Sequence, residues 1–350
     1  MTDDGFARRL LAWYRRHGRH DLPWRQTRDP YAIWISEIML QQTQVATVLP
    51  YYRRFMAAFP DVARLAGAPL DAVLAHWSGL GYYARARNLH AAARRIVTHH
   101  GGRLPDDPAA LQALPGIGRS TAGAILALAF HRPAPILDGN VRRVLCRYRA
   151  VPGWPGDPAV ERRLWALAQA LTPARRAHDY TQAIMDLGAG VCTRSRPRCP
   201  ACPQRHHCRA HARGQETAFP RARPRRARPR REVAMILARD PRGRVLLARR
   251  PPAGLWGGLW SLPECDPGED VAAWCRQRLG LAVRGRRDWP VLEHGFTHFV
   301  LHIHPVLVDV TGTVRVMEHR PTVWYNPQRP GGRGLAAPVR RLLERLGSIP

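Results

Sequence analysis

Two acidic residues lie in surroundings that suit acid catalysis. Glu37 is the only charged residue between Asp29 and Arg53, and Tyr31 to Leu40 holds eight apolar residues in ten. A helix that is apolar on all sides is expected to be buried, and burial raises the pKa of a carboxyl group. Glu37 can then stay protonated near neutral pH and act as a general acid. A buried glutamate paired with an arginine, with no catalytic role, is the alternative.

Asp138 precedes a second helical stretch, in the segment ILDGNV at residues 136–141. A carboxylate at a helix N-cap accepts backbone N–H groups and is expected to be ionised, although a cap needs no further function. Cleavage of a glycosidic bond requires one neutral carboxyl group as the acid and one anion for the oxocarbenium-like sugar. Glu37 and Asp138 together therefore suit cleavage of a glycosidic bond, for which a nucleoside is one possible substrate.

Four of the seven cysteines form a cluster with the spacing C-x6-C-x2-C-x5-C. They are Cys192, Cys199, Cys202 and Cys208. Disulfides are disfavoured in the cytosol, and four thiolates at these spacings suit either a [4Fe–4S] cluster or a structural Zn²⁺. The spacing alone leaves both metals open.

A glycine-containing segment, LPGIGRSTAG at residues 114–123, precedes an apolar helical run. Gly116 and Gly118 allow backbone N–H groups to approach an anion at a helix N-terminus, which suits a DNA phosphate and carries no base specificity. A plain helix–helix turn is the alternative.

The charge balance points to a polyanionic partner. All 55 basic residues are arginine against 26 acidic residues, which gives a net charge of +29, so nucleic acid is the expected ligand. The chain has no lysine, which excludes enzymes that form a Schiff base through a side-chain amine. There is no apolar run of the roughly 20 residues that a membrane helix needs, and no signal peptide. We expect a cytoplasmic protein, associated with the nucleoid through DNA, and a monomer by default.

The elements that must position these residues fall into two domains. Residues 1–220 have helical spacing, as in Phe6 to His17 and Leu70 to Trp77, and predict an all-α domain. Residues 221–232 are rich in arginine and proline and predict a linker.

Residues 233–350 predict a small α/β domain. Val233 to Ala238 and Val245 to Ala248 flank the turn sequence DPRG and indicate a β-hairpin. Phe299 to Val310 alternates as a strand in which Pro305 marks an edge or a bulge. Asp270 to Leu279 and Ala337 to Leu346 have helical spacing.

Five motifs occur together in this chain: SEIMLQQTQV, GLGYYARARNL, LPGIGRSTAG, ILDGNV and the four-cysteine loop. The combination closely resembles adenine DNA glycosylases of the MutY type, within the helix-hairpin-helix glycosylase superfamily. The resemblance implies a two-lobed all-α catalytic domain with an iron–sulfur cluster loop, a [4Fe–4S] cluster on the four cysteines, and excision of adenine from double-stranded DNA containing A:8-oxoguanine or A:G mispairs in base excision repair.

The same resemblance assigns roles to single residues. Glu37 matches the proton donor to adenine, Asp138 the residue that stabilises the transition state, and Asn140 a supporting polar group of the active site. Gln42 and Tyr82 resemble residues that enter the base stack when adenine is flipped out.

Ser120 separates this chain from a neighbouring family. Endonuclease III-like glycosylases, which act on oxidised pyrimidines and also cut the strand, have a lysine at the corresponding place. Serine at 120 implies an enzyme that removes the base and spares the strand. An endonuclease III-like enzyme and a catalytically silent protein that binds 8-oxoguanine damage remain the alternatives.

The second domain resembles a Nudix fold, which hydrolyses pyrophosphates with the motif G-x5-E-x7-R-E-U-x-E-E. Gly258 and Glu264 fit the start of this motif. Its later R-E and E-E positions hold no acidic residue in this chain, so the carboxylates that would hold Mg²⁺ are missing. Those positions hold Ala272, Ala273, Arg276 and Gln277. We therefore expect a recognition domain for 8-oxoguanine. Within it, Phe296-Thr297-His298 resembles the family's F-S-H loop, with Thr297 and His298 as DNA contacts and threonine in place of serine.

Overall fold

The structure is a computed structural model that describes residues 4–223, 228–251, 254–296, 298–314, 321–329 and 331–347. These residues form two compact units, and each is described by itself. The helical unit comprises residues 4–67 and 88–223, and the C-terminal unit comprises residues 68–87 and 228–347. Thr297 lies outside the described residues.

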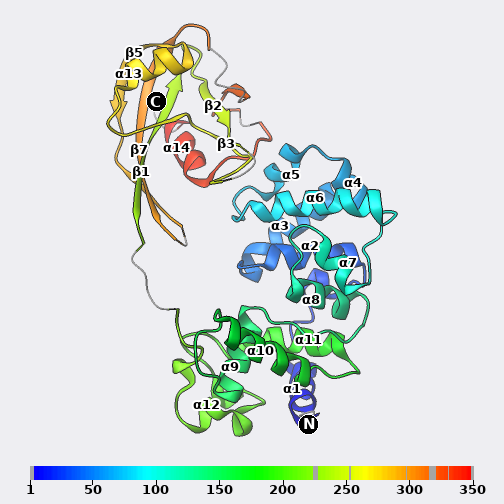
Figure 1. Ribbon diagram of the computed structural model, residues 1–350. Coiled ribbons are helices and arrows are strands. Elements are labelled where there is room, and N and C mark those ends of the chain that lie inside the picture. Colours follow the sequence, from blue (N-terminus) through cyan, green and yellow to red (C-terminus); the bar gives the residue numbers. More distant parts are fainter. Residues whose placement is uncertain are drawn as a thin grey trace. The chain divides into compact units, whose positions relative to one another are not determined.

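The helical unit is all-α, as predicted (Figure 1). Its helices are α1 (Asp4–His17), α2 (Pro30–Leu40), α3 (Val45–Ala58), α4 (Val62–Gly67), α6 (Ala84–His99, from residue 88), α7 (Pro108–Ala113), α8 (Arg119–Ala129), α9 (Gly139–Arg149), α10 (Pro158–Leu171), α11 (Ala177–Asp186) and α12 (Arg209–Ala212). Short turns of helix lie at Pro23–Arg25, Leu187–Val191, Cys199–Ala201, Arg205–His207 and Glu216–Ala218. Among the described residues, no helix is both long enough and apolar enough to cross a bilayer.

The core of the helical unit explains why α2 has so little polar sequence. Trp34, Ile35 and Met39 are fully buried, and α2 packs against α3 and α8 (Figure 1). A helix enclosed in this way has apolar residues on nearly all sides.

The C-terminal unit combines α5 (Leu70–Trp77) with an eight-stranded sheet and two further helices. The strands are β1 (Arg230–Arg239), β2 (Val245–Arg249), β3 (Trp260–Ser261), β4 (Glu264–Cys265), β5 (Ala282–Asp288), β6 (Leu292–Gly295), β7 (Val300–Thr311) and β8 (Thr322–Tyr325). Their order is β3-β2-β1-β7-β5, with β4 beside β1, β6 beside β7 and β8 beside β2, and β1 runs parallel to β7 (Figure 1). Helix α13 (Val271–Trp274) continues as a wide turn over Cys275–Leu279, and α14 (Ala337–Gly347) ends the unit.

The predicted β-hairpin is present, with β1 and β2 antiparallel. The Gly243 N–H donates to the Asp240 carbonyl over 2.9 Å, and Gly243 has a φ of 74°, which favours glycine. The first strand begins at Arg230 rather than at Val233, inside the predicted linker. Arg230 and Arg231 pair with β7 through their backbones while their side chains remain exposed, so charge did not prevent strand pairing.

The prediction that Pro305 marks an edge or a bulge is wrong. β7 is an interior strand, with β1 on one side and β5 and β6 on the other. The pairing with β5 ends at Val306 and the pairing with β6 begins at Ile303, so Pro305 lies where the neighbour changes. A residue without an N–H is tolerated there because no ladder bond on that side needs it.

Candidate active site

Glu37 is placed by α2, which begins directly after Asp29. The Asp29 carboxylate accepts the N–H of Tyr31 over 3.0 Å and of Ala32 over 3.3 Å, and Pro30 occupies the first helical position. The neighbours of Glu37 on both sides are buried, whereas Glu37 is half-buried because it lines a cleft.

That cleft has a volume of about 830 Å³ and lies entirely within the helical unit. It brings together residues that are far apart in the sequence. Of the predicted site residues, it contains Glu37, Gln42, Ser120, Asp138 and Asn140; charged lining residues that were not predicted are Arg19, Arg25 and Arg143.

Asp138 caps α9, as predicted. Its carboxylate accepts the N–H of Val141 over 2.7 Å. Ser120 supports the same segment from α8, because its hydroxyl accepts the N–H of Leu137 over 3.0 Å. Ser120 therefore holds the segment that leads to Asp138.

The two carboxyl groups influence each other's protonation. Burial, together with the charge of Asp138, raises the pKa of Glu37 to about 7, and the charge of Arg25 opposes this rise. Burial also raises the pKa of Asp138, against the backbone hydrogen bonds at its cap and the charges of Arg143 and Arg142. The cap hydrogen bonds favour the ionised form of Asp138, as expected, and burial opposes them.

Asn140 is held by Arg143, a residue that the sequence analysis missed. Arg143 Nη2 donates to Asn140 Oδ1 over 2.8 Å and to the Gly188 carbonyl over 2.7 Å, and its Nε donates to the Cys192 carbonyl over 2.6 Å. A Cβ at Gly188 would come within 2.6 Å of Asn140 Cβ, so this contact needs glycine. The spacing of Asn140 and Arg143, three residues apart on one helix, was a signal that could have revealed the pair.

The predicted DNA-contacting residues of the helical unit differ in backbone conformation. Gln42 has a φ of 56° and lines the cleft, directly after α2. Gly116 has a φ of 80°, and a Cβ there would lie 2.9 Å from Asn88 Cβ, so this turn requires glycine. Gly118 is the N-cap of α8 and leaves open space around its Cα.

The four predicted cysteines line one small cavity in the helical unit. Burial raises the pKa of Cys199 to about 11 and of Cys202 to about 12, so these thiols hold protons that a metal would displace. The buried Arg147 donates to Cys192 Sγ over 3.3 Å, and the Cys208 thiol donates to the Arg147 carbonyl over 3.4 Å. Four sulfur donors around one cavity, with a hydrogen-bond donor aimed at one of them, fit a thiolate-bound metal cluster.

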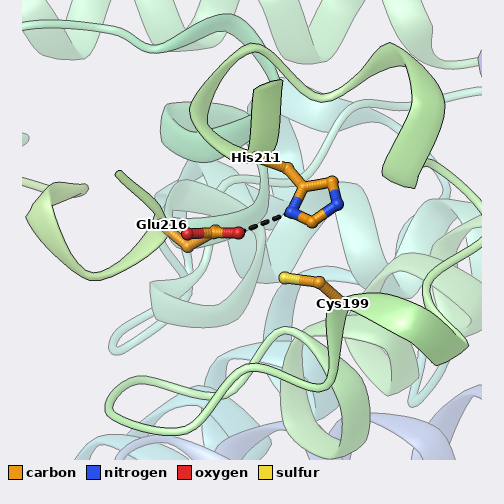
Figure 2. Close-up of side chains that lie close together, drawn as sticks. All are labelled: Cys199, His211 and Glu216. Atoms are coloured by element: carbon orange, nitrogen blue, oxygen red, sulfur yellow. Dashed lines mark hydrogen bonds and ion pairs between the residues drawn. The ribbon is translucent and has the colours of Figure 1, made fainter. Parts of the chain in front are cut away.

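Figure 2 shows a second set of ligand atoms at the same loop. Cys199, His211 and Glu216 have donor atoms within 4.8 Å of one another, which could suit Zn²⁺. His211 Nδ1 and Glu216 Oε1 already form a hydrogen bond of 2.5 Å. Cys199, His211 and Glu216 line the same cavity as the other three thiols, so the two ligand sets share one site.

Comparison with known proteins decides the family. Residues 35–170 match the HhH-GPD superfamily base excision DNA repair proteins, and residues 233–345 match the NUDIX domain. The adenine DNA glycosylase of Buchnera aphidicola subsp. Acyrthosiphon pisum (strain APS) is 35% identical over 345 residues, which cover 98% of both chains. The chain belongs to the adenine DNA glycosylase family. It is therefore an N-glycosylase of base excision repair.

Other relatives of this adenine DNA glycosylase extend the comparison. The Rattus norvegicus adenine DNA glycosylase is 42% identical over 310 residues, covering 74% of this chain and 60% of the rat protein. A solved thermostable thymine-DNA glycosylase is 30% identical with a TM-score of 0.54, covering 60% of this chain and 96% of that chain.

The NUDIX-like part of this adenine DNA glycosylase lacks most of the acidic residues of a pyrophosphohydrolase. Glu264, which fits the start of that motif, forms an ion pair with Arg250. The later positions lie on α13 and the turn after it, and Ala272, Ala273, Arg276 and Gln277 offer no carboxylate.

His298 lies between β6 and β7 of the C-terminal unit. The Phe296 N–H donates to the Phe299 carbonyl over 2.9 Å, which closes the loop, and the His298 ring packs edge-on against Phe299 at 4.8 Å. Phe296 also contacts Trp256, with ring centroids 5.5 Å apart. His298 is exposed at the tip of this aromatic cluster.

Tyr82 lies in a loop of the C-terminal unit and has a positive φ, a backbone conformation that is strained for a residue other than glycine. Gly79, Gly81 and Tyr82 all have positive φ, and the Tyr82 side chain is 53% exposed. Tyr83 anchors the loop, since its hydroxyl accepts the Gly79 N–H over 3.1 Å and donates to the Leu335 carbonyl over 3.3 Å. An exposed aromatic on a strained, anchored loop is suited to contacting a partner.

Proposed function

We propose that this enzyme excises adenine mispaired with 8-oxoguanine or guanine in duplex DNA, with Glu37 as the general acid and Asp138 as the stabiliser of the cationic sugar. The observation that carries the proposal is the pair of carboxyl groups that line one cleft, with the pKa of Glu37 raised to about 7. An acid with this pKa is largely protonated below neutral pH and can still release its proton.

The proposed reaction uses a protonated Glu37 and an ionised Asp138. Glu37 gives its proton to the adenine ring, the bond between the sugar and the base breaks, and its electron pair leaves with the base. The oxocarbenium ion that remains is stabilised by the Asp138 carboxylate until water adds at the sugar carbon, and the proton that the water loses would return to the Glu37 carboxylate. Asn140, held by Arg143, supplies a fixed polar group beside the sugar.

DNA binding is proposed to use both units. Gly116 and Gly118 would place backbone N–H groups against phosphates at the N-terminus of α8. Gln42 and Tyr82 would enter the base stack as adenine flips out, a step that costs a few kcal/mol and is offset by contacts in the cleft.

Substrate assays distinguish this function from the alternatives. Single-turnover reactions with duplexes containing adenine opposite 8-oxoguanine should release adenine and leave the strand intact until it is treated with alkali. Duplexes with thymine glycol should stay intact. Release of an oxidised pyrimidine would favour an endonuclease III-like activity, and binding without release would favour a silent damage sensor.

Cys192, Cys199, Cys202 and Cys208 are proposed to hold a [4Fe–4S] cluster. Their thiolates would supply its four protein ligands, and the cluster would fix the shape of the loop that carries Arg194, Arg196 and Arg198. Those side chains could then bind DNA phosphates, so the proposed cluster is structural for DNA binding.

We expect purified protein to be brown and to contain about four irons and four sulfides per chain, the stoichiometry of this cluster type. Cys199→Ser should lose the visible absorbance and DNA binding together, whereas Cys275→Ser, at a buried cysteine of the C-terminal unit, should keep both. Colourless, zinc-containing protein from an anaerobic preparation would instead point to zinc, with His211 and Glu216 as further candidate ligands.

The NUDIX-like domain is proposed to recognise 8-oxoguanine through Thr297 and His298. We expect His298→Ala in the full chain to reduce the preference for 8-oxoguanine over guanine by about tenfold, the effect of losing one hydrogen bond of roughly 1–3 kcal/mol to the base. Excision opposite guanine should continue at the normal rate. Single-turnover rates and affinities on both mispairs, measured at one salt concentration, provide the test.

A chain that ends at Arg223 should lose the same preference. It retains Phe219, which is buried and whose carbonyl accepts Arg147 Nε over 2.9 Å. This truncation also removes Arg249, which pairs with Asp71, and Gly257, whose carbonyl accepts a hydrogen bond from Arg87. His298→Ala leaves these contacts in place and is therefore the more specific test. An unchanged preference in both proteins would place 8-oxoguanine recognition in the helical unit.

A further inference from the structure

Asp186, the last residue of α11, forms a second cluster of charges with the buried Arg25 and the partly exposed Arg19. Its side chain is 3% exposed. Arg25 donates to both carboxylate oxygens, from Nη1 over 2.6 Å and from Nη2 over 2.7 Å. Arg19 donates from its backbone N–H over 3.0 Å and from Nε over 2.8 Å.

These bonds fix the Arg25 guanidinium in one place. Its Nη1 also donates to the Arg19 carbonyl over 2.8 Å, and the Arg25 side chain is 6% exposed. Burial alone would raise the pKa of Asp186, but hydrogen bonds and charge from Arg25 and Arg19 lower it, so the carboxylate stays ionised. A bidentate pair restricts the guanidinium in angle as well as distance.

The cluster has two positive charges and one negative charge, and it borders the catalytic cleft. Arg19, Arg25 and Glu37 all line that cleft. The charge of Arg25 favours the ionised form of Glu37, whereas burial and Asp138 favour the protonated form. Of the other arginines that line the cleft, Arg19 is bonded to Asp186 and Arg143 to Asn140. The residues that α3 and α8 contribute to the lining are uncharged: Val45, Ala46, Ser120, Thr121, Ala124 and Leu128.

We propose that Asp186 and Arg25 are positioning residues for the proton donor: Asp186 fixes the Arg25 guanidinium at the cleft wall, and this fixed charge keeps Glu37 acidic enough to release its proton. The proposal rests on the proposed role of Glu37 as the general acid. A general acid is most effective when its proton affinity matches the working pH. Without Arg25, burial and Asp138 would make Glu37 hold its proton too tightly.

The test is the pH dependence of single-turnover adenine excision by the full-length, cluster-containing protein, from about pH 5.5 to about pH 9. The wild-type rate should fall as the pH rises through about 7, because the protonated form of Glu37 is the active one. In Arg25→Met this fall should move to higher pH by about one unit, since a neighbouring positive charge has been removed. Arg25→Lys keeps the charge and should stay close to wild type.

In Asp186→Asn the decline of the excision rate should also move to higher pH, as in Arg25→Met, because a neutral amide cannot hold two guanidinium groups. Asp106→Asn is the matched control. Asp106 is 66% exposed and pairs with the exposed Arg132, so this substitution should leave the pH dependence of excision unchanged. Thermal melts and the visible absorbance of the cluster establish that each variant is folded. If Asp186→Asn cannot be purified, Arg25→Met and Arg25→Lys decide the proposal.

An unshifted profile in Arg25→Met would overturn the proposal, and so would a shift to lower pH in Asp186→Asn, which would show that Arg25 stays in place without its anchor. These results would leave the proposed function intact if Glu37→Gln is inactive. Turnover by Glu37→Gln, in contrast, would remove the general acid itself.

Discussion

Glu37→Gln is expected to slow adenine excision by about a thousandfold or more, because the amide keeps the shape of the side chain but cannot donate the proton. Duplex binding should stay within roughly tenfold of wild type, since a neutral amide replaces a group that is itself largely neutral below pH 7. Single-turnover rates at saturating enzyme, with a separate binding titration, separate the two effects.

The pH dependence provides an internal check on the same residue. Because burial raises the pKa of Glu37 to about 7, wild-type activity should decline above neutral pH as the acid loses its proton. Any residual activity of Glu37→Gln should lack this decline. Glu232→Gln, at an exposed glutamate of β1, is a control that should behave as wild type. A glutamine variant that keeps both its rate and the decline would exclude Glu37 as the acid.

Asp138→Asn is expected to slow the chemical step by about a hundredfold to a thousandfold, because a neutral amide cannot stabilise a developing cation. Asparagine caps helices as well as aspartate does, so α9 should keep its start and the protein its fold. The same single-turnover assay, with thermal melts, measures both consequences.

Asp157→Asn is a closely matched control for that substitution. Asp157 caps α10 by accepting the N–H of Ala159 over 2.9 Å and of Val160 over 3.3 Å, and it lies outside the cleft. Its replacement should leave excision unchanged. If Asp138→Asn only weakened DNA binding and left the chemical step at full speed, the proposed role of Asp138 would be wrong.

Local patterns in the sequence predicted the elements of the fold well. The amphipathic spacing of Phe6 to His17 lies within α1, and the turn at Asp240 to Gly243 joins two strands as expected. The error at Pro305 concerns contacts between distant segments, since the partner of β7 changes from β5 to β6 beside it. Residues 68–87 group with the C-terminal unit through contacts such as Arg87 with Gly257, which also join distant segments. Spacing along the chain carries no information about such partners.

In the candidate site too, local patterns in the sequence were predictive and contacts between distant residues were not. Glu37 and Asp138 were found because each stands in a distinctive local context, an apolar helix and a helix cap. Asp186 and Arg25 were missed because 161 positions separate them, and neither has unusual neighbours in the sequence. The burial of Asp138, which raises its pKa, was not predicted for a related reason, since it depends on the packing of the whole cleft.

Arg147 has a consequence for the order in which the cysteine loop is built. Its guanidinium donates to the carbonyls of Thr193, Arg194 and Phe219, so one side chain of α9 holds both ends of the loop. Bringing the ends of a loop together reduces the conformational entropy of the chain. Because Arg147 does this through protein bonds alone, part of that entropy is lost without a metal, and the proposed cluster would have less of the chain left to order.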